Sequence, residues 1–93
     1  MIQSFGNTET ENIWRGIQSR RFPFSIQGVA RRKLRMINSA QNLLDLRVPP
    51  ANHLEKLKGT WLGYHSIRVN DQWRIVFQWK RDHAFDVTII DYH

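Results

Sequence analysis

Polar side chains that can move protons gather in the second half of this 93-residue chain. His53 follows a double proline, and the sequence ends in Asp91-Tyr92-His93. Cleavage of RNA by its own 2′-hydroxyl needs a base, an acid for the leaving 5′-oxygen, and cations that stabilise the charge on phosphorus. Histidine titrates near neutral pH and suits the proton transfers. These residues predict a ribonuclease site for which no metal or cofactor is obligatory.

Cations near these groups could hold the phosphate. Arg68 and Arg74 occupy polar positions in a segment of alternating hydrophobicity, and Lys56 precedes it. Arginine keeps its charge and can grip a phosphate through two parallel hydrogen bonds, whereas lysine offers a point charge. His65 shares the parity of the apolar Ile67, so we expect it to pack rather than react.

Each of these residues also has a simpler interpretation. His53 could be an ordinary loop histidine, and a chain end is commonly frayed. Against fraying, Asp91-Tyr92-His93 continues an apolar strand pattern that should hold it in place. A zinc site built from His53, Asp91 and His93 has no recognisable ligand spacing, so we expect no metal.

Helical patterns fill the first half of the chain. The segment IQSF favours a short first strand, and Thr8 with Glu11 offers a capping box for a helix near residues 8–18. Ser25 is the expected cap of a second helix. Its apolar residues recur every three to four positions, at Ile26, Val29, Ala30, Leu34, Ile37, Ala40 and Leu44.

The hydrophobic period changes to two after residue 52, which is typical of half-buried strands. The residues that share the apolar parity are Ile67, Val69, Trp73, Ile75, Phe77, Trp79, Phe85, Val87 and Ile89. Turn residues at 70–71 and 81–83 predict an antiparallel meander. We therefore predict one α+β domain spanning residues 1–93. Two N-terminal helices pack on one face of a small antiparallel-rich sheet, and the other face is polar, exposed and arginine-bearing.

Charge is strongly basic in this small protein, with 14 Lys and Arg against eight Asp and Glu, a net charge of +6. No acidic residue lies between Glu11 and Asp45, a stretch that contains Arg15, Arg20, Arg21, Arg31, Arg32, Lys33 and Arg35. This cluster indicates a polyanionic partner, although a merely solvated helix face would look similar. The absence of cysteine excludes disulfides, thiolate metal sites and a cysteine nucleophile. Without a signal or membrane-spanning pattern, we expect a cytoplasmic protein with no membrane association.

Three segments resemble the HigB toxins, also called plasmid-maintenance killer proteins, of the wider RelE/ParE group. They are residues 49–59 (PPANHLEKLKG), 63–75 (GYHSIRVNDQWRI) and 87–93 (VTIIDYH). The resemblance covers essentially the whole chain and rests on the order and spacing of these segments. It implies a RelE/ParE-like fold and a ribosome-dependent endonuclease that cleaves messenger RNA in the A site without a cofactor.

The resemblance also implies roles for individual residues and partners. The catalytic positions carry over onto His53, Asp91, Tyr92 and His93, and the phosphate-binding positions onto Arg68, Arg74 and Lys56. The expected partners are the ribosome with its message and a helix-turn-helix, HigA-like antitoxin, while operator DNA is bound only through the antitoxin complex. We expect docking on the ribosome, or on the antitoxin, to use Arg31, Arg32, Lys33 and Arg35.

Two other functions fit parts of the sequence. A ParE-like toxin of the same fold would inhibit DNA gyrase without cutting RNA, because fold alone does not determine activity. A non-catalytic nucleic-acid-binding protein would depend on Arg31, Arg32 and Arg35, while its C-terminal residues would be dispensable.

Overall fold

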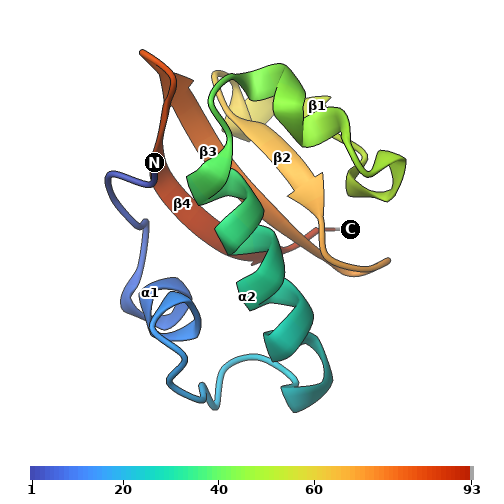
Figure 1. Ribbon diagram of the computed structural model, residues 1–93. Coiled ribbons are helices and arrows are strands. Elements are labelled where there is room, and N and C mark those ends of the chain that lie inside the picture. Colours follow the sequence, from blue (N-terminus) through green and yellow to red (C-terminus); the bar gives the residue numbers. More distant parts are fainter. Residues whose placement is uncertain (93) are drawn as a thin grey trace.

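A four-stranded antiparallel sheet with the strand order β1-β2-β3-β4 forms the frame of the protein (Figure 1). This computed structural model describes residues 1–92. The strands are β1 (Glu55–Lys56), β2 (His65–Arg68), β3 (Trp73–Lys80) and β4 (His83–Asp91). The predicted meander of the last three strands is therefore confirmed. The predicted strand IQSF is reduced to two isolated parallel bridges, in which Ile2 and Phe5 pair with Ala84 and Val87 along β4.

Two α-helices precede the sheet, as predicted, but their ends differ from the prediction. Helix α1 (Thr8–Trp14) is capped by Asn7, whose side-chain oxygen accepts from the Thr10 amide at 2.8 Å. It stops well before residue 18, and Gly16 lies just beyond its end with a φ of 78°. Helix α2 (Phe24–Ser39) begins directly after Pro23, so Ser25 lies inside its first turn rather than capping it.

Three short 3₁₀ helices complete the chain. They are η1 (Leu43–Arg47), η2 (Pro50–Asn52) and η3 (Gly59–Trp61). Leu44, which was predicted to extend the stripe of the second helix, lies in η1 with 56% of its surface exposed. No helix within residues 1–92 is long and apolar enough to cross a membrane.

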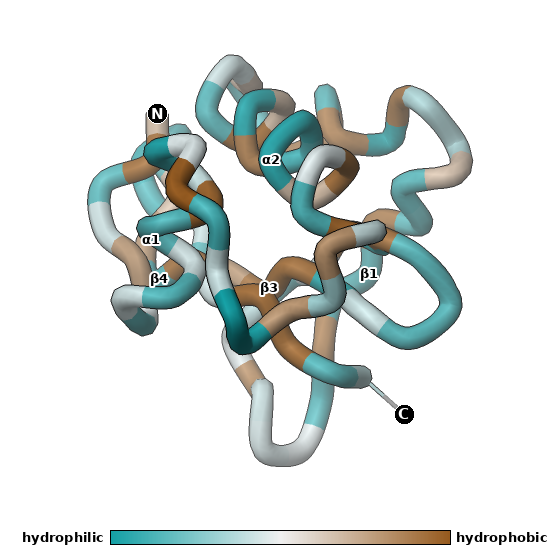
Figure 2. Tube along the Cα trace, turned by 90° about the horizontal axis from the view of Figure 1, so that it is seen from below, coloured by the Kyte–Doolittle hydropathy of each residue, from teal (hydrophilic) through white to brown (hydrophobic). Residues whose placement is uncertain are grey.

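Both helices cover one face of the sheet, and the core lies between these two layers (Figure 1). Figure 2 shows hydrophobic positions scattered among hydrophilic ones along α2, and hydrophobic positions along β3. Five residues of the predicted helical stripe are buried, namely Ile26, Ala30, Leu34, Ile37 and Ala40. They pack with residues of the strands and with Val69 just after β2, which confirms the predicted core face; the strand residues are Ile67, Ile75, Phe77, Val87 and Ile89.

A bulge in β4 makes the prediction for Phe85 wrong. Ile75 pairs with Ile89, yet Gln78 pairs with Phe85, so β4 contains one more residue than β3 over this stretch. The extra residue is accommodated at Asp86, whose φ is 57°. An inserted residue reverses the alternation of side chains. Phe85 therefore faces away from the helices, and Ala84 takes the core position.

The sheet face away from the helices is less bare than predicted. Ser66 and Val76, which point to this side, are fully buried. The hydroxyl of Tyr64, in the connection between β1 and β2, donates a hydrogen bond to the Asp86 carboxylate on β4. Since β3 lies between β2 and β4, this contact crosses β3. The sheet face away from the helices is therefore partly covered at one end, and its open part lies toward Arg68 and Arg74.

Candidate active site

His53 lies on a tightly anchored turn at the end of η2. It adopts the left-handed conformation, with φ 45° and ψ 58°, and its side chain is exposed. The preceding Asn52 is fully buried. The Asn52 amide nitrogen donates to the carbonyl oxygens of Leu46 and Val48 at 3.1 and 3.4 Å. The turn therefore presents the His53 imidazole to solvent from a fixed backbone.

Arg74 joins this turn to the sheet. Its Nε donates to Ser66 Oγ at 2.8 Å, and its Nη2 donates to the His53 carbonyl oxygen at 2.5 Å. Glu55 lies 3.6 Å away as an ion-pair partner, and the guanidinium lies 5.7 Å from the centre of the Tyr92 ring. With only 7% of its surface exposed, Arg74 is buried rather than presented on an open face. The guanidinium thus organises the groups around it. We call Arg74 and these neighbours the Arg74 cluster: the Asn52–His53 turn, Glu55, Ser66 and Tyr92.

Arg68 is the more accessible of the two predicted phosphate-binding arginines. It pairs with Arg74 across β2 and β3, so both side chains share the face away from the helices. One third of its side chain is exposed, and its partner Asp71 is fully exposed. Burial lowers the pKa of both Arg74 and Lys33, and the nearby charge of Arg68 lowers each further. Because these cations repel one another, an incoming phosphate would be stabilised here.

The C-terminal segment continues β4 to Asp91, and the side chains of Asp91 and Tyr92 diverge. Asp91 pairs with Trp73, while the preceding residue pairs with Arg74. Alternation therefore directs Asp91 to the face of Trp73 and Tyr92 to that of Arg74. The Tyr92 amide donates to the Gln72 carbonyl at 2.7 Å, and the Gln72 amide group donates to the Asp91 carboxylate at 3.0 Å. His93 lies outside the described residues.

Lys56 is exposed in β1 and pairs with His65. Alternation places it on the opposite side of the sheet from Glu55 and Arg74, so the structure does not bring it into the Arg74 cluster. His65 packs against the Phe77 ring at a centroid distance of 6.1 Å, as predicted. Burial and the charge of Lys56 lower the pKa of His65.

The four predicted docking residues of α2 do not share one environment. Arg32 and Arg35 are exposed, and Arg31 is half-buried, with its Nε donating to the Trp14 carbonyl at 3.4 Å. Lys33 is buried, and its Nζ lies 2.5 Å from Asn52 Oδ1. Docking through Lys33 would need an exposed side chain, whereas this side chain is enclosed.

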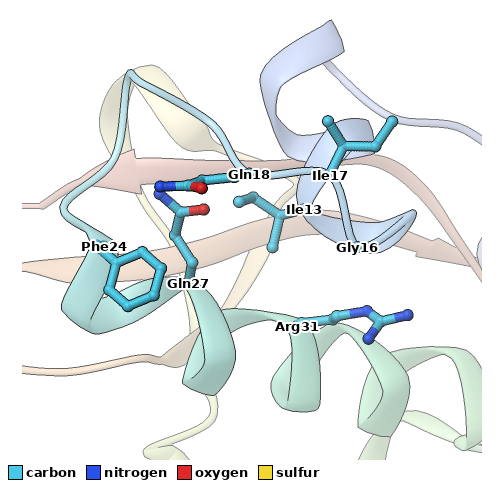
Figure 3. Close-up of a pocket in the computed structure, with 7 residues that line it drawn as sticks. All are labelled: Ile13, Gly16, Ile17, Gln18, Phe24, Gln27 and Arg31. Atoms are coloured by element: carbon cyan, nitrogen blue, oxygen red, sulfur yellow. The ribbon is translucent and has the colours of Figure 1, made fainter.

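A separate hollow lies between α1 and α2, away from the Arg74 cluster. Figure 3 shows Phe24 and Ile17 on its two sides, Ile13 and Gln27 between them, and Arg31 below. Phe24 and Ile17 are both exposed hydrophobic residues. Of the predicted site residues, Arg31 is the one that contributes to its lining.

Three contributors to the Arg74 cluster were not predicted as such, namely Glu55, Ser66 and Asn52. Ser66 has the same strand parity as Arg68, so the alternation could have indicated it. Asn52 and Glu55 carry no such signal, because their contacts with Lys33 and Arg74 join residues distant in the sequence. Within residues 1–92, no three His, Cys, Asp or Glu side chains lie close enough to hold a metal ion.

Two solved structures of known proteins share this arrangement. The chain superposes on the toxin–antitoxin complex YoeB–YefM from Staphylococcus aureus with a TM-score of 0.61 and 19% identity, covering 100% of this chain and 98% of that one. YafQ from E. coli gives a TM-score of 0.57 at 14% identity, covering 98% and 93% of the two chains. These similarities establish the fold, and they match the predicted RelE/ParE-like class.

Sequence comparison is more specific. Toxin HigB-1 of Vibrio cholerae is 45% identical over 74 residues, which cover 80% of this chain and 77% of that protein. An uncharacterized Haemophilus influenzae protein is 42% identical over 62 residues, covering 67% and 61% of the two chains. Residues 3–93 match the family described as HigB-like toxin, the RelE-like toxin of a type II toxin–antitoxin system. The chain belongs to this family, which confirms the resemblance.

Proposed function

We propose that this toxin is a ribosome-dependent endoribonuclease that cleaves message in the A site by attack of the 2′-hydroxyl. The observation that carries the proposal is the convergence of the His53 turn, Arg68, Arg74 and Tyr92 at one side of the sheet. This site combines the exposed imidazole of His53 with two cations, the buried Arg74 and the partly exposed Arg68. That combination suits general acid–base catalysis and stabilisation of a phosphorane.

Within this site the proposed roles are as follows. His53 and His93 divide the acid and base steps. Arg68 contacts the phosphate, and Arg74 adds positive charge from a fixed position. Tyr92, next to the Arg74 guanidinium, can donate to a phosphate oxygen or stack on a base. Asp91 orients its neighbours from the opposite face, and Lys56 makes at most a peripheral phosphate contact.

The proposed partners follow from the family and from charge. A type II toxin is expected to have an antitoxin, for which a helix-turn-helix, HigA-like protein is proposed, with operator DNA bound through that complex. The solved complex of YoeB with YefM supports an antitoxin partner. Exposed Arg32 and Arg35, together with the half-buried Arg31, are proposed to dock on ribosomal RNA phosphates.

Cleavage mapping on translated message tests the proposal. Primer extension after expression of the wild type should reveal new cuts within codons. His93→Ala should reduce their rate by ~10²–10⁴-fold, as expected for loss of an acid–base group. An absence of cuts, or an unchanged pattern with His93→Ala, would contradict the assigned activity or site. A gyrase supercoiling assay should show no inhibition, and inhibition without cuts would favour the ParE-like alternative.

A further inference from the structure

Lys33 differs from the other basic residues of α2 because it is buried at 7% exposure. Its position in the helix explains this, since Ile26, Ala30, Lys33 and Ile37 follow the spacing of one buried stripe. Lysine is rarely buried without a partner, because desolvation of its ammonium is costly. The partner here is Asn52 Oδ1, 2.5 Å from the Lys33 Nζ.

Asn52 uses its whole amide group to hold the turn before His53. Its oxygen accepts from Lys33, while its nitrogen donates to the carbonyls of Leu46 and Val48. The residue has no exposed surface. Removal of Lys33 would leave a buried acceptor without its charged donor, and such groups are costly to leave unsatisfied.

The His53 turn also holds Arg74 in place. The His53 carbonyl accepts from Arg74 Nη2 at 2.5 Å, and Ser66 Oγ accepts from Arg74 Nε at 2.8 Å. The His53 backbone therefore helps to fix where the Arg74 guanidinium lies relative to the Tyr92 ring. A continuous series of contacts runs from α2 to the proposed active site.

From these contacts we propose that Lys33 is a positioning residue of the active site, acting through Asn52 and the His53 turn on Arg74, and not a docking cation. This inference rests on the proposed function for its catalytic consequence. Its structural part, the control of Arg74 by Lys33, stands independently. Burial, with the charges of Arg32 and Arg68, lowers the pKa of Lys33, which agrees with an ammonium enclosed beside other cations.

The first test measures the link to Arg74 directly. In the wild type, the Arg74 Nε–H should exchange slowly with solvent in NMR spectra, because it is buried and hydrogen-bonded. Lys33→Met should accelerate this exchange by ~10-fold or more, since one buried contact of the series is lost. Lys80→Met, the same change at an exposed lysine at the end of β3, should leave it unchanged. Unchanged exchange in Lys33→Met would overturn the inference whatever the activity of the protein.

The second test measures catalysis on ribosome-bound message in single turnover. Lys33→Met should lower the cleavage rate by ~10–100-fold, because misplacement of a reacting group by about 1 Å has this order of effect. The toxin concentration that gives the half-maximal rate should change little. A docking cation would instead weaken binding and flatten its salt dependence. That second pattern would overturn the inference.

Two further variants separate positioning from general damage. Lys33→Arg keeps a charged donor and should recover most of the slow Arg74 exchange, so a result no better than that of Lys33→Met counts against the inference. In an Arg74→Lys background, Lys33→Met should cost much less activity than in the wild type. Additive losses would mean that Lys33 does not act through Arg74. If the wild type cleaves no message but the exchange results hold, the proposed function fails and the structural link stands.

Discussion

Replacement of Arg74 by lysine keeps the positive charge but removes the planar guanidinium. In the structure this group makes two directed hydrogen bonds, from Nε to Ser66 Oγ at 2.8 Å and from Nη2 to the His53 carbonyl at 2.5 Å. A lysine ammonium cannot reproduce both bonds with the same geometry. At least one buried acceptor should therefore lose its charged donor.

The expected loss of stability follows from that count. A hydrogen bond to a charged group contributes about 1.5–3 kcal/mol, and the side chain of Arg74 is only 8% exposed, so solvent screening is small. Loss of one such bond should therefore lower the free energy of unfolding by about 1.5–3 kcal/mol. For a domain of this size, 1 kcal/mol corresponds to ~4–8 °C in Tm, so Arg74→Lys should melt at least ~6 °C lower.

Arg68→Lys provides the matched control on the neighbouring strand. The ion pair of Arg68 with fully exposed Asp71 should contribute only about 0–1 kcal/mol, so this variant should melt close to the wild type. Thermal melts followed by circular dichroism measure both, and cleavage assays should show reduced activity for both. An unchanged Tm for Arg74→Lys, or an equal loss for Arg68→Lys, would refute the view that Arg74 is the buried organiser.

Three other perturbations test separate parts of the structure. The hydrogen bond to the Asp86 carboxylate, together with burial, raises the pKa of Tyr64. This bond therefore stabilises the fold below the pKa of an unfolded tyrosine, and its contribution is lost as the pH rises through the folded-state pKa. Tyr64→Phe should accordingly lower Tm at pH 7 but not at strongly alkaline pH. Lys56→Gln should raise the pKa of His65 in an NMR titration, because a neighbouring positive charge that opposes protonation is removed; a pKa that does not move would contradict the assigned cause. Charge reversal at Arg32 and Arg35 should weaken co-sedimentation with ribosomes, most clearly at rising salt, and unchanged association would reject docking through α2.

Features with a local period were predictable from the sequence. The spacing of Ile26, Ala30, Leu34 and Ile37 identified the buried side of α2, because a helix repeats every 3.6 residues whatever surrounds it. The meander was predictable for the same reason, because the side chains of a strand alternate between the two faces of the sheet with a period of two. The helix ends were not predictable in this way. Asn7 and Pro23, whose backbones are not helical, stand at the cap positions in place of the predicted Thr8 and Ser25.

The errors arose where one residue changed the geometry. Asp86 adds a residue to β4 with a positive φ, and nothing in the alternation signals an insertion, so Phe85 was assigned to the wrong face. Lys33 is a different case. Its charge suggested an exposed side chain, although its spacing from Ala30 and Ile37 placed it on the buried stripe. Spacing was the better guide, because Asn52 supplies a partner that only the folded chain brings near.

The C-terminal residues show how alternation limits the active site. Successive side chains of a strand point to opposite faces, so Asp91 and Tyr92 cannot both approach Arg74. The structure brings Tyr92 to Arg74 and directs Asp91 toward Trp73. Gln72 connects them, because its carbonyl accepts from the Tyr92 amide and its side chain donates to Asp91. Of the two roles considered for Asp91, orientation of a neighbour therefore fits this geometry better than transfer of a proton at the site. On this reasoning Asp91→Asn, which keeps an acceptor for Gln72, should retain much more cleavage activity than Asp91→Ala, and equal losses would indicate that the carboxylate itself takes part in the chemistry.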